Sequence, residues 1–179
     1  MKRPHLVRDI VELLALTIVI FLALRFTIQT YSVNDPGMTP ALNQNSYILV
    51  NKVAYLFHPP ERSDVIVFHF PYDTTKVYIK RVIGIPGDKV STDGSHVWVN
   101  GVQLNEPYVN NPFNPSAREW TVPQDQYFVM GDNRQEGEDS RKWGTVPKNY
   151  IIGKATLVFW PSSQWRSIPN YPDVFKQIK

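Results

Sequence analysis

The sequence predicts a mostly β domain, built from antiparallel sheets and hairpins, that follows one N-terminal transmembrane helix. Two observations carry this prediction. The first is an apolar segment near the N-terminus that is long enough to cross a lipid bilayer. The second is the pattern after residue 42, where short β-branched and aromatic runs alternate with turn residues. The 179 residues suffice for about one domain, and the absence of cysteine excludes disulfides and cysteine-bound zinc.

The predicted helix is centred on Leu13–Leu24, a run in which Thr17 is the only polar residue. Glu12 and Arg25 lie near its two ends, where long charged side chains reach the membrane interface. A helix in a protein core would show a polar stripe, and none runs through this segment. A cleaved signal peptide would be followed by small residues, whereas residues 25–31 are bulky. We therefore expect a retained membrane anchor.

The charges beside the helix predict its orientation. Three basic residues precede it: Lys2, Arg3 and Arg8. The positive-inside rule keeps such residues in the cytoplasm. This predicts a cytoplasmic N-terminus over residues 1–9, a transmembrane helix over 10–30 and an extracytoplasmic domain over 31–179 of a cell-membrane protein. The chain carries +3, and its first 30 residues hold four basic and two acidic groups, so the domain carries about +1. That charge excludes a nucleic-acid-binding footprint.

The strands are predicted from residue type and from the turn residues between them. Five runs are rich in β-branched and aromatic residues: Tyr47–Val53, Asp64–Phe70, Lys76–Ile83, Gln126–Met130 and Ile151–Trp160. Asn100-Gly101 is a strong hairpin signal between two further short strands, His96–Val99 and Val102–Leu104. Residues 105–123 are rich in proline and asparagine, and we expect them to be irregular. The tail after Trp160 mixes aromatic and charged residues, a pattern that allows it to lie on the membrane surface.

Four stretches occur in an order that is typical of one family. They are Val33–Leu42, Lys80–Asp88, Asn100-Gly101 with Glu106–Val109, and Gly131–Arg134 with Asp139–Arg141 and Trp143-Gly144. Together they resemble type I signal peptidases, in which Ser-Met-x-Pro-Thr-Leu follows the membrane anchor and a Gly-Asp-Asn-Arg…Asp-Ser-Arg box comes later. The resemblance implies the β fold of that family and cleavage of the signal peptides of exported proteins. It implies no cofactor, and the scattered histidines and the spacing of the acidic run 132–139 predict no metal site.

The resemblance assigns the general base to Lys80 and substrate contacts to Met38 and Pro40. A serine hydroxyl attacks once a base takes its proton, and a lysine is such a base only in its neutral form, which burial among apolar groups favours. In a strand Lys80 shares its face with Tyr78 and Val82, which predicts apolar surroundings. A lysine that extends to solvent is the alternative.

Gly37 occupies the position of the nucleophilic serine, so the predicted catalytic dyad is incomplete. Gly37 can offer its backbone N–H to an oxyanion, but it has no side chain that attacks a carbonyl. Ala41 replaces the motif's threonine, Gly137 stands where the box usually has a serine, and Asp35-Pro36 occupies the place of small residues. Several such changes favour natural loss of activity over an engineered knockout. Among the other residues near the site, we expect structural roles for Asp132, Asp139, Ser140 and Arg141.

Two hypotheses about function remain open. In the first, the protein is inactive and either binds signal peptides or serves as a subunit of a membrane assembly. In the second, it is an active peptidase with a displaced hydroxyl nucleophile from Thr39, Ser32 or Ser140. If residues 37–39 form a strand, Thr39 faces the same way as Gly37 at a separation of roughly 6–7 Å.

Overall fold

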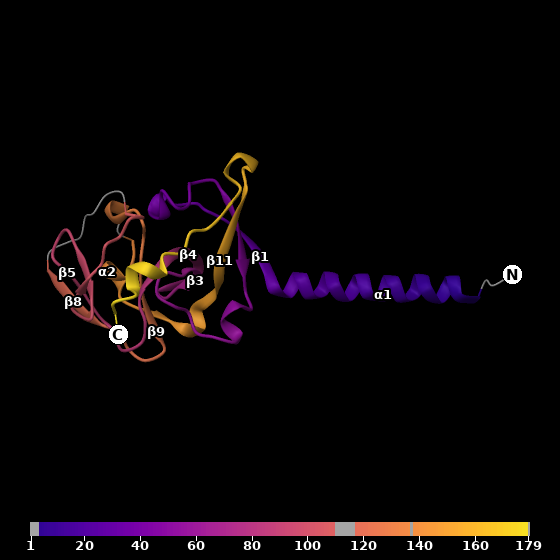
Figure 1. Cartoon of the computed structure of the whole chain (residues 1–179), viewed down its shortest axis with the longest axis horizontal. Coiled ribbons are helices and arrows are strands. Elements are labelled where there is room, and N and C mark those ends of the chain that lie inside the picture. The colour runs from indigo at the N-terminus through magenta and orange to yellow at the C-terminus, as the bar shows by residue number, and fades with distance from the viewer. Residues whose placement is uncertain (1–3, 110–116, 137, 179) are drawn as a thin grey trace.

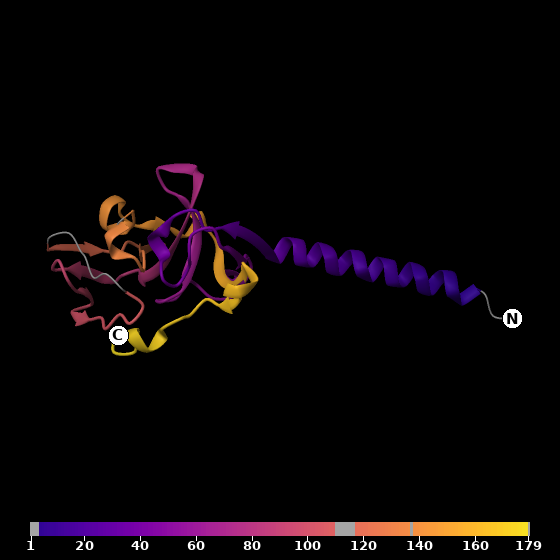
Figure 2. The same ribbon diagram turned by 90° about the horizontal axis from the view of Figure 1, so that it is seen from above.

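The computed structural model describes residues 4–109, 117–136 and 138–178, which form one long helix and a β domain (Figure 1). Helix α1 (Pro4–Thr27) extends away from the β domain in both views (Figures 1 and 2). Leu6–Thr27 is long and apolar enough to cross a membrane, and none of this span is buried inside the protein. A helix of 22 residues rises about 33 Å, which matches the roughly 30 Å hydrocarbon core of a bilayer. The length and composition of α1 therefore fit a membrane anchor.

The helix ends at Thr27, three residues before the predicted limit at residue 30. Strand β1 (Ile28–Ser32) follows without a loop and pairs with β2 (Tyr47–Asn51) in an antiparallel register that joins Ile28 to Asn51. The carbonyl group of Thr27 accepts a hydrogen bond from the N–H of Lys52, at 2.9 Å. Pairing with β2 thus ends the helix, and the anchor is joined directly to the sheet.

The larger sheet has the strand order β1-β2-β11-β3-β4-β9-β10, with β12 paired to β11, and its neighbours are antiparallel. Its remaining strands are β3 (Val65–Phe70), β4 (Asp73–Gly84), β9 (Gln126–Met130), β10 (Val146–Pro147), β11 (Ile151–Trp160) and β12 (Arg166–Ser167). The five predicted strand runs lie in this sheet and form β2, β3, β4, β9 and β11. The predicted mostly β fold with an N-terminal helix is confirmed.

A smaller sheet has the order β7-β6-β5-β8 and lies at the end of the domain remote from α1 (Figure 1). Its strands are β5 (Lys89–Thr92), β6 (Val97–Val99), β7 (Val102–Gln103) and β8 (Arg118–Thr121). The predicted hairpin joins β6 to β7, and Asn100 and Gly101 both have positive φ, as a two-residue type I′ turn requires. The expectation that residues 105–123 are irregular is wrong for β8, because Arg118–Thr121 pairs with β5.

The helical segments apart from α1 are short. Helix α2 spans Ser140–Trp143, and 3-10 helices span Pro36–Met38, Ala54–Leu56, Arg134–Glu136, Lys148–Tyr150, Ser162–Gln164 and Pro172–Phe175. All but the last, which follows β12, connect strands, and two of them, Pro36–Met38 and Arg134–Glu136, lie at the site described below.

The last part of the C-terminal tail packs on the domain. Phe175 and Ile178 are buried in the core between the two sheets, in one cluster with Ile83 and Phe128. The N–H of Tyr171 donates to the hydroxyl group of Ser63 at 2.6 Å. Phe175 therefore completes the hydrophobic core, whereas Trp165 lies on the surface.

Candidate active site

Gly37 lies in a tight turn just after β1. The chain turns there through the 3-10 helix Pro36–Met38, and Asp35 precedes this helix with an extended backbone. The Asp35 carboxylate accepts a hydrogen bond from the Gly37 N–H at 2.5 Å, the interaction that a capping aspartate makes. The assumption that residues 37–39 form a strand is therefore wrong. Thr39 belongs to the end of this turn, and its hydroxyl group donates to the Leu42 carbonyl at 3.4 Å.

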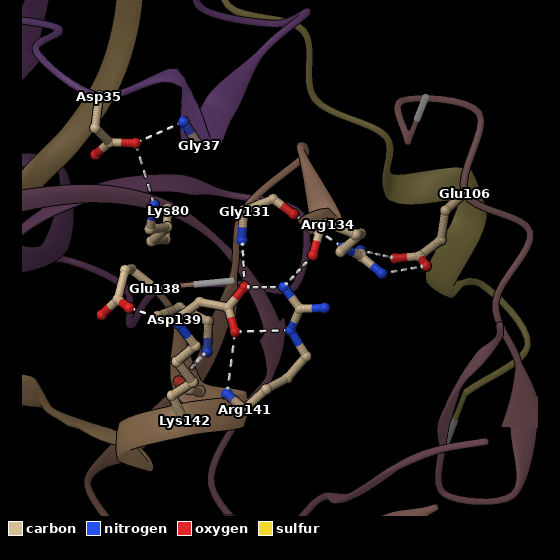
Figure 3. Close-up of polar contacts among 12 residues, drawn as sticks. Asp35, Gly37, Lys80, Glu106, Gly131, Arg134, Glu138, Asp139, Arg141 and Lys142 are labelled. Carbon is tan, nitrogen blue, oxygen red and sulfur yellow. Dashed lines mark hydrogen bonds and ion pairs between the residues drawn. The ribbon is translucent and has the colours of Figure 1, made fainter. Parts of the chain in front are cut away.

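Lys80 reaches the same turn from β4. The register places Lys80 opposite Ile66 of β3, and Tyr78 and Val82 pack in the apolar cluster that contains Ile66. Only 1% of Lys80 is exposed, so it does not extend to bulk solvent. Its Nζ lies 3.6 Å from Asp35 Oδ1 and 6.0 Å from the centre of the Tyr78 ring. Figure 3 shows that the Gly37 N–H and the Lys80 amine approach the same oxygen of the Asp35 carboxylate.

The space beside Gly37 is occupied by charged groups. A Cβ atom built on Gly37 would collide with Lys80 Nζ and with Asp35 Oδ1. Both are the ends of flexible side chains, so a larger residue could displace them. The structure thus brings together Gly37 and Lys80, which the resemblance had paired. It also adds Asp35, which sequence reasoning had noted only as a departure from the family pattern.

The Gly131–Arg134 segment supports this turn from the other side (Figure 3). The N–H of Asn133 donates to the Gly37 carbonyl at 3.0 Å. A Cβ atom on Gly131 would collide with that same carbonyl, so glycine allows the two segments to approach. Asp139 in turn accepts the N–H of Gly131 at 3.1 Å. The box therefore fixes the position of the Gly37 backbone.

Buried ion pairs surround the site. Arg81, next to Lys80, donates from Nε and Nη2 to the two carboxylate oxygens of Asp132, at 2.8 and 2.7 Å. Arg134 makes a similar double contact with Glu106. Arg141 and Asp139 form a third pair, and the Ser140 hydroxyl accepts the N–H of Val129 at 2.9 Å. These contacts fit the structural roles expected for residues 132, 139, 140 and 141. Gly137 lies outside the described residues.

The two residues predicted to contact substrate differ in exposure. Met38 is buried in the core together with Val33 and Leu42, beneath the turn. Pro40 is exposed on the surface next to it. Direct contact with a bound peptide is therefore sterically open to Pro40, whereas Met38 supports the turn from below.

A groove of about 420 Å³ lies between β1 and β4, and its lining includes Asn34 and Ile79, the neighbours in sequence of Asp35 and Lys80. Tyr31, Ser32 and Asn34 line one wall, and residues 75–79 line the other. Both walls are strand edges. Strand β1 is the last strand at its end of the sheet, and among the described residues β9 pairs with β4 only from Arg81 onward. An extended peptide could therefore hydrogen-bond to main-chain groups on both sides.

The two walls run in the same direction. Four antiparallel pairings separate β1 from β4, namely β1–β2, β2–β11, β11–β3 and β3–β4, so these strands are parallel to each other. Strand β1 leads to the turn with Gly37, and strand β4 contains Lys80. The groove therefore runs along both strands toward these two residues.

The three hydroxyl groups considered as displaced nucleophiles have partners away from Lys80. The Ser32 hydroxyl donates to the Asn34 side chain at 2.8 Å, and the Thr39 hydroxyl donates to the Leu42 carbonyl. The Ser140 hydroxyl accepts the N–H of Val129. Over the described part of the chain, no hydroxyl group makes a hydrogen bond to Lys80 Nζ. The arrangement lacks the hydroxyl–amine contact that activates a serine or threonine.

Substitution of Asp139 by asparagine is expected to lower the free energy of unfolding at neutral pH and to change it little in acid. Burial raises the pKa of the Asp139 carboxyl, but hydrogen bonds and charge from Arg141, with the Gly131 N–H, lower it more, so the net pKa is below its usual value. Ionised Asp139 thus stabilises the fold above its ordinary pKa of about 3.9, and this contribution is lost as pH falls through the lower folded-state pKa. We expect Asp139→Asn to lose roughly 2 kcal/mol at pH 7.

This prediction is checked by denaturant unfolding of the full-length protein in detergent at pH 7, 4 and 3. The difference in unfolding free energy between the two proteins should narrow as pH falls below about 4. A difference that stays constant over this range would show that the charge of Asp139 is not what stabilises the loop.

The chain is similar to known proteins over most of its length. The sequence profile described as signal peptidase, peptidase S26, matches residues 6–160. A Synechocystis protein named probable signal peptidase I-1 is 37% identical over 92% of this chain and 88% of that protein. Signal peptidase I of Leptolyngbya laminosa is 38% identical over 84% of this chain and 78% of that protein. A crystal structure of a signal peptidase I from Enterococcus faecalis matches 53% of this chain and 95% of that one, with 32% identity and a TM-score of 0.47.

Proposed function

Because this chain belongs to the signal peptidase family, peptidase S26, we propose that it binds signal peptides of exported proteins without cleaving them. The observation that carries this proposal is the arrangement of Gly37, Asp35 and Lys80. The groove that leads to them supplies two strand edges for a peptide, and the position of the nucleophile holds no side chain.

The missing nucleophile is accompanied by a change in the other catalytic groups. In an acyl-transfer site, a backbone N–H stabilises the oxyanion, and a neutral amine takes the proton of the nucleophile. Here the Gly37 N–H donates a hydrogen bond to the Asp35 carboxylate, and the Lys80 amine forms an ion pair with the same carboxylate. Lys80 is therefore the counter-ion of Asp35. Each group that the reaction requires is either absent or bound to Asp35.

Peptide binding does not require the lost groups. Strand addition relies on main-chain hydrogen bonds along the groove, with side-chain pockets adding selectivity. The edges of β1 and β4 persist in this chain because they are part of the fold itself. We therefore expect the groove to keep its affinity for an extended peptide.

The proposed setting is the cell membrane, with α1 spanning the bilayer, its N-terminus in the cytoplasm and the β domain outside. The basic residues before the helix support this orientation through the positive-inside rule. The direct connection of α1 to β1 then holds the entrance of the groove close to the membrane, where a signal peptide emerges.

The test is photo-crosslinking in membranes that contain the full-length protein. A photoreactive residue is introduced at Asn34, in the groove wall, or at Glu119, an exposed position on β8 that serves as the control. A preprotein should crosslink to the first position and not to the second, and its signal peptide should stay intact.

Two results would contradict the proposal. Cleavage by the unaltered protein would do so. If that cleavage is lost in Lys80→Ala and is also lost in a separate variant, Thr39→Ala, Ser32→Ala or Ser140→Ala, the residue changed in that separate variant is the displaced nucleophile. Absence of any crosslink at Asn34, with stable purification in a larger complex, would identify a structural subunit of a membrane assembly instead.

A further inference from the structure

We propose that the junction between helix α1 and the β domain binds the phosphate headgroup of an anionic phospholipid. The inference rests on the proposed setting, in which α1 spans the bilayer and the β domain lies outside it. The site is a pocket of about 470 Å³ that shares no lining residue with the peptide groove. Six residues line this junction pocket: Arg25, Phe26, Ile28, Gln29, Thr30 and Lys52.

The junction pocket forms where the helix passes directly into the sheet. Arg25 lies in the last turn of α1, and β1 follows the helix without a loop. The second cation, Lys52, comes from the end of β2. Its backbone N–H donates to the Thr27 carbonyl at 2.9 Å, which fixes the residue beside the helix end. The fold therefore brings two cations that are distant in sequence to the same pocket.

The two cations have no counter-ion within the protein. Both are exposed, and over the described part of the chain neither side chain forms an ion pair or a hydrogen bond. None of the six lining residues is acidic. A guanidinium group binds two phosphate oxygens at once, and an ammonium group adds a compact charge beside it. Arg25 and Lys52 together are therefore complementary to a phosphate group.

The position of the junction pocket along α1 matches the level of the lipid headgroups. The span Leu6–Thr27 has 22 residues and rises about 33 Å, so its last turn reaches the edge of a hydrocarbon core of roughly 30 Å. Phe26 and Ile28, which are 71% and 42% exposed, add an apolar wall beside the cations. A phospholipid offers a phosphate next to apolar chains, whereas a soluble phosphate offers the charge alone. The lining therefore favours a lipid.

The charge of the junction pocket also selects among phospholipids. A zwitterionic headgroup carries an ammonium or choline group next to its phosphate, and Arg25 and Lys52 repel that second charge. The lining has no carboxylate that would bind it. Phosphatidylglycerol carries the phosphate and two hydroxyl groups, which suit the side chains of Gln29 and Thr30 as hydrogen-bond partners. We therefore expect a preference for phosphatidylglycerol.

The test measures the lipids that the full-length protein binds in a non-ionic detergent. Phosphatidylglycerol and phosphatidylcholine with identical acyl chains are added in equal amounts, and the bound lipids are counted by native mass spectrometry. We expect phosphatidylglycerol to bind at least about tenfold more tightly, because two cations contact its phosphate. Glycerol 3-phosphate has the charged group without acyl chains, so it should not displace the lipid at the same concentration.

Variants locate the preference. Arg25→Gln combined with Lys52→Gln should reduce it to within about twofold. The matched control is Arg118→Gln combined with Lys89→Gln, which removes the same two charges from exposed positions on β8 and β5. These strands belong to the smaller sheet, remote from α1 (Figure 1). The control should keep the full preference.

Several results would overturn the lipid site. Equal binding of the two lipids by the unaltered protein would do so, as would a preference that the Arg25 and Lys52 variant keeps or that the control loses. Displacement by glycerol 3-phosphate would assign the pocket to a soluble phosphate compound. Release of the unaltered protein from membranes by carbonate would show that the proposed setting is wrong as well. Peptide crosslinking at Asn34 is measured separately, so a failure of the lipid site is distinguishable from a failure of the peptide groove.

Discussion

Gly37→Ser combined with Asp35→Ala is expected to give a protein that cleaves preproteins, whereas the unaltered protein does not. The serine side chain would project to where Lys80 Nζ and Asp35 Oδ1 now lie, and both are flexible ends that can shift. The hydroxyl group then lies beside the amine that takes its proton. Removal of Asp35 frees the backbone N–H of residue 37 and releases Lys80 from its ion pair.

The single variant Gly37→Ser should cleave preproteins much more slowly than the double variant, because Asp35 still competes for the backbone N–H of residue 37 and for Lys80. One oxyanion-hole donor is worth about 10²–10³ in kcat, which sets the expected gain from Asp35→Ala in the serine background. The measurement is preprotein cleavage in membranes, followed by gel mobility. Addition of Lys80→Ala should abolish the activity. Equal rates for the single and double variants would show that Asp35 does not block the site.

Arg81→Ala is expected to lower the free energy of unfolding by about 3–5 kcal/mol, since it removes one partner of a buried ion pair. Arg81 and Asp132 are both 0% exposed, so the change leaves an unpaired carboxylate inside the protein. The guanidinium group also packs beside the rings of Tyr108 and Tyr171, which contact each other, with its Cζ 4.6 and 5.2 Å from their centres. Arg81→Lys should rescue little of the loss, because an ammonium group cannot make the double contact.

A matched control is the exposed ion pair between Lys142 and Glu138, whose side chains are both 59% exposed. Lys142→Ala should change stability by no more than about 1 kcal/mol. Both variants are compared by guanidinium unfolding of the full-length protein in detergent. A loss below 1 kcal/mol for Arg81→Ala would mean that water reaches Asp132 and replaces the arginine.

The strands that were predicted correctly are those whose pattern is local. Residues 65–70 and 151–160 contain enough β-branched and aromatic residues to be predicted as strands from their own sequence, and Asn100-Gly101 is by itself typical of a hairpin turn. Strand β8 was missed because the pattern of Arg118–Thr121 is weak and its pairing with β5 is a long-range contact. Strand β1 was missed because the predicted transmembrane helix was extended to residue 30, over most of Ile28–Ser32.

The candidate site was predictable in part. The burial of Lys80 followed from its apolar neighbours in the strand, and the vacated serine position followed from the resemblance. The contact between Asp35 and Lys80 was not foreseen, because it joins residues 45 positions apart across a 3-10 turn that had been interpreted as a strand. The signal was present as an aspartate followed by proline and glycine, a sequence that favours a capped turn.

The packing of residues 169–178 against Arg81 and Ile83 has a consequence for the order in which the domain folds. The carbonyl group of Pro169 accepts a hydrogen bond from Arg81, and Phe175 and Ile178 close the core beside Ile83. Residues 169–178 are therefore needed before the centre of the domain can be completed. Until they are in place, the core around Ile83 leaves apolar surface uncovered, so a folding intermediate that lacks this last contact is expected to be prone to aggregation.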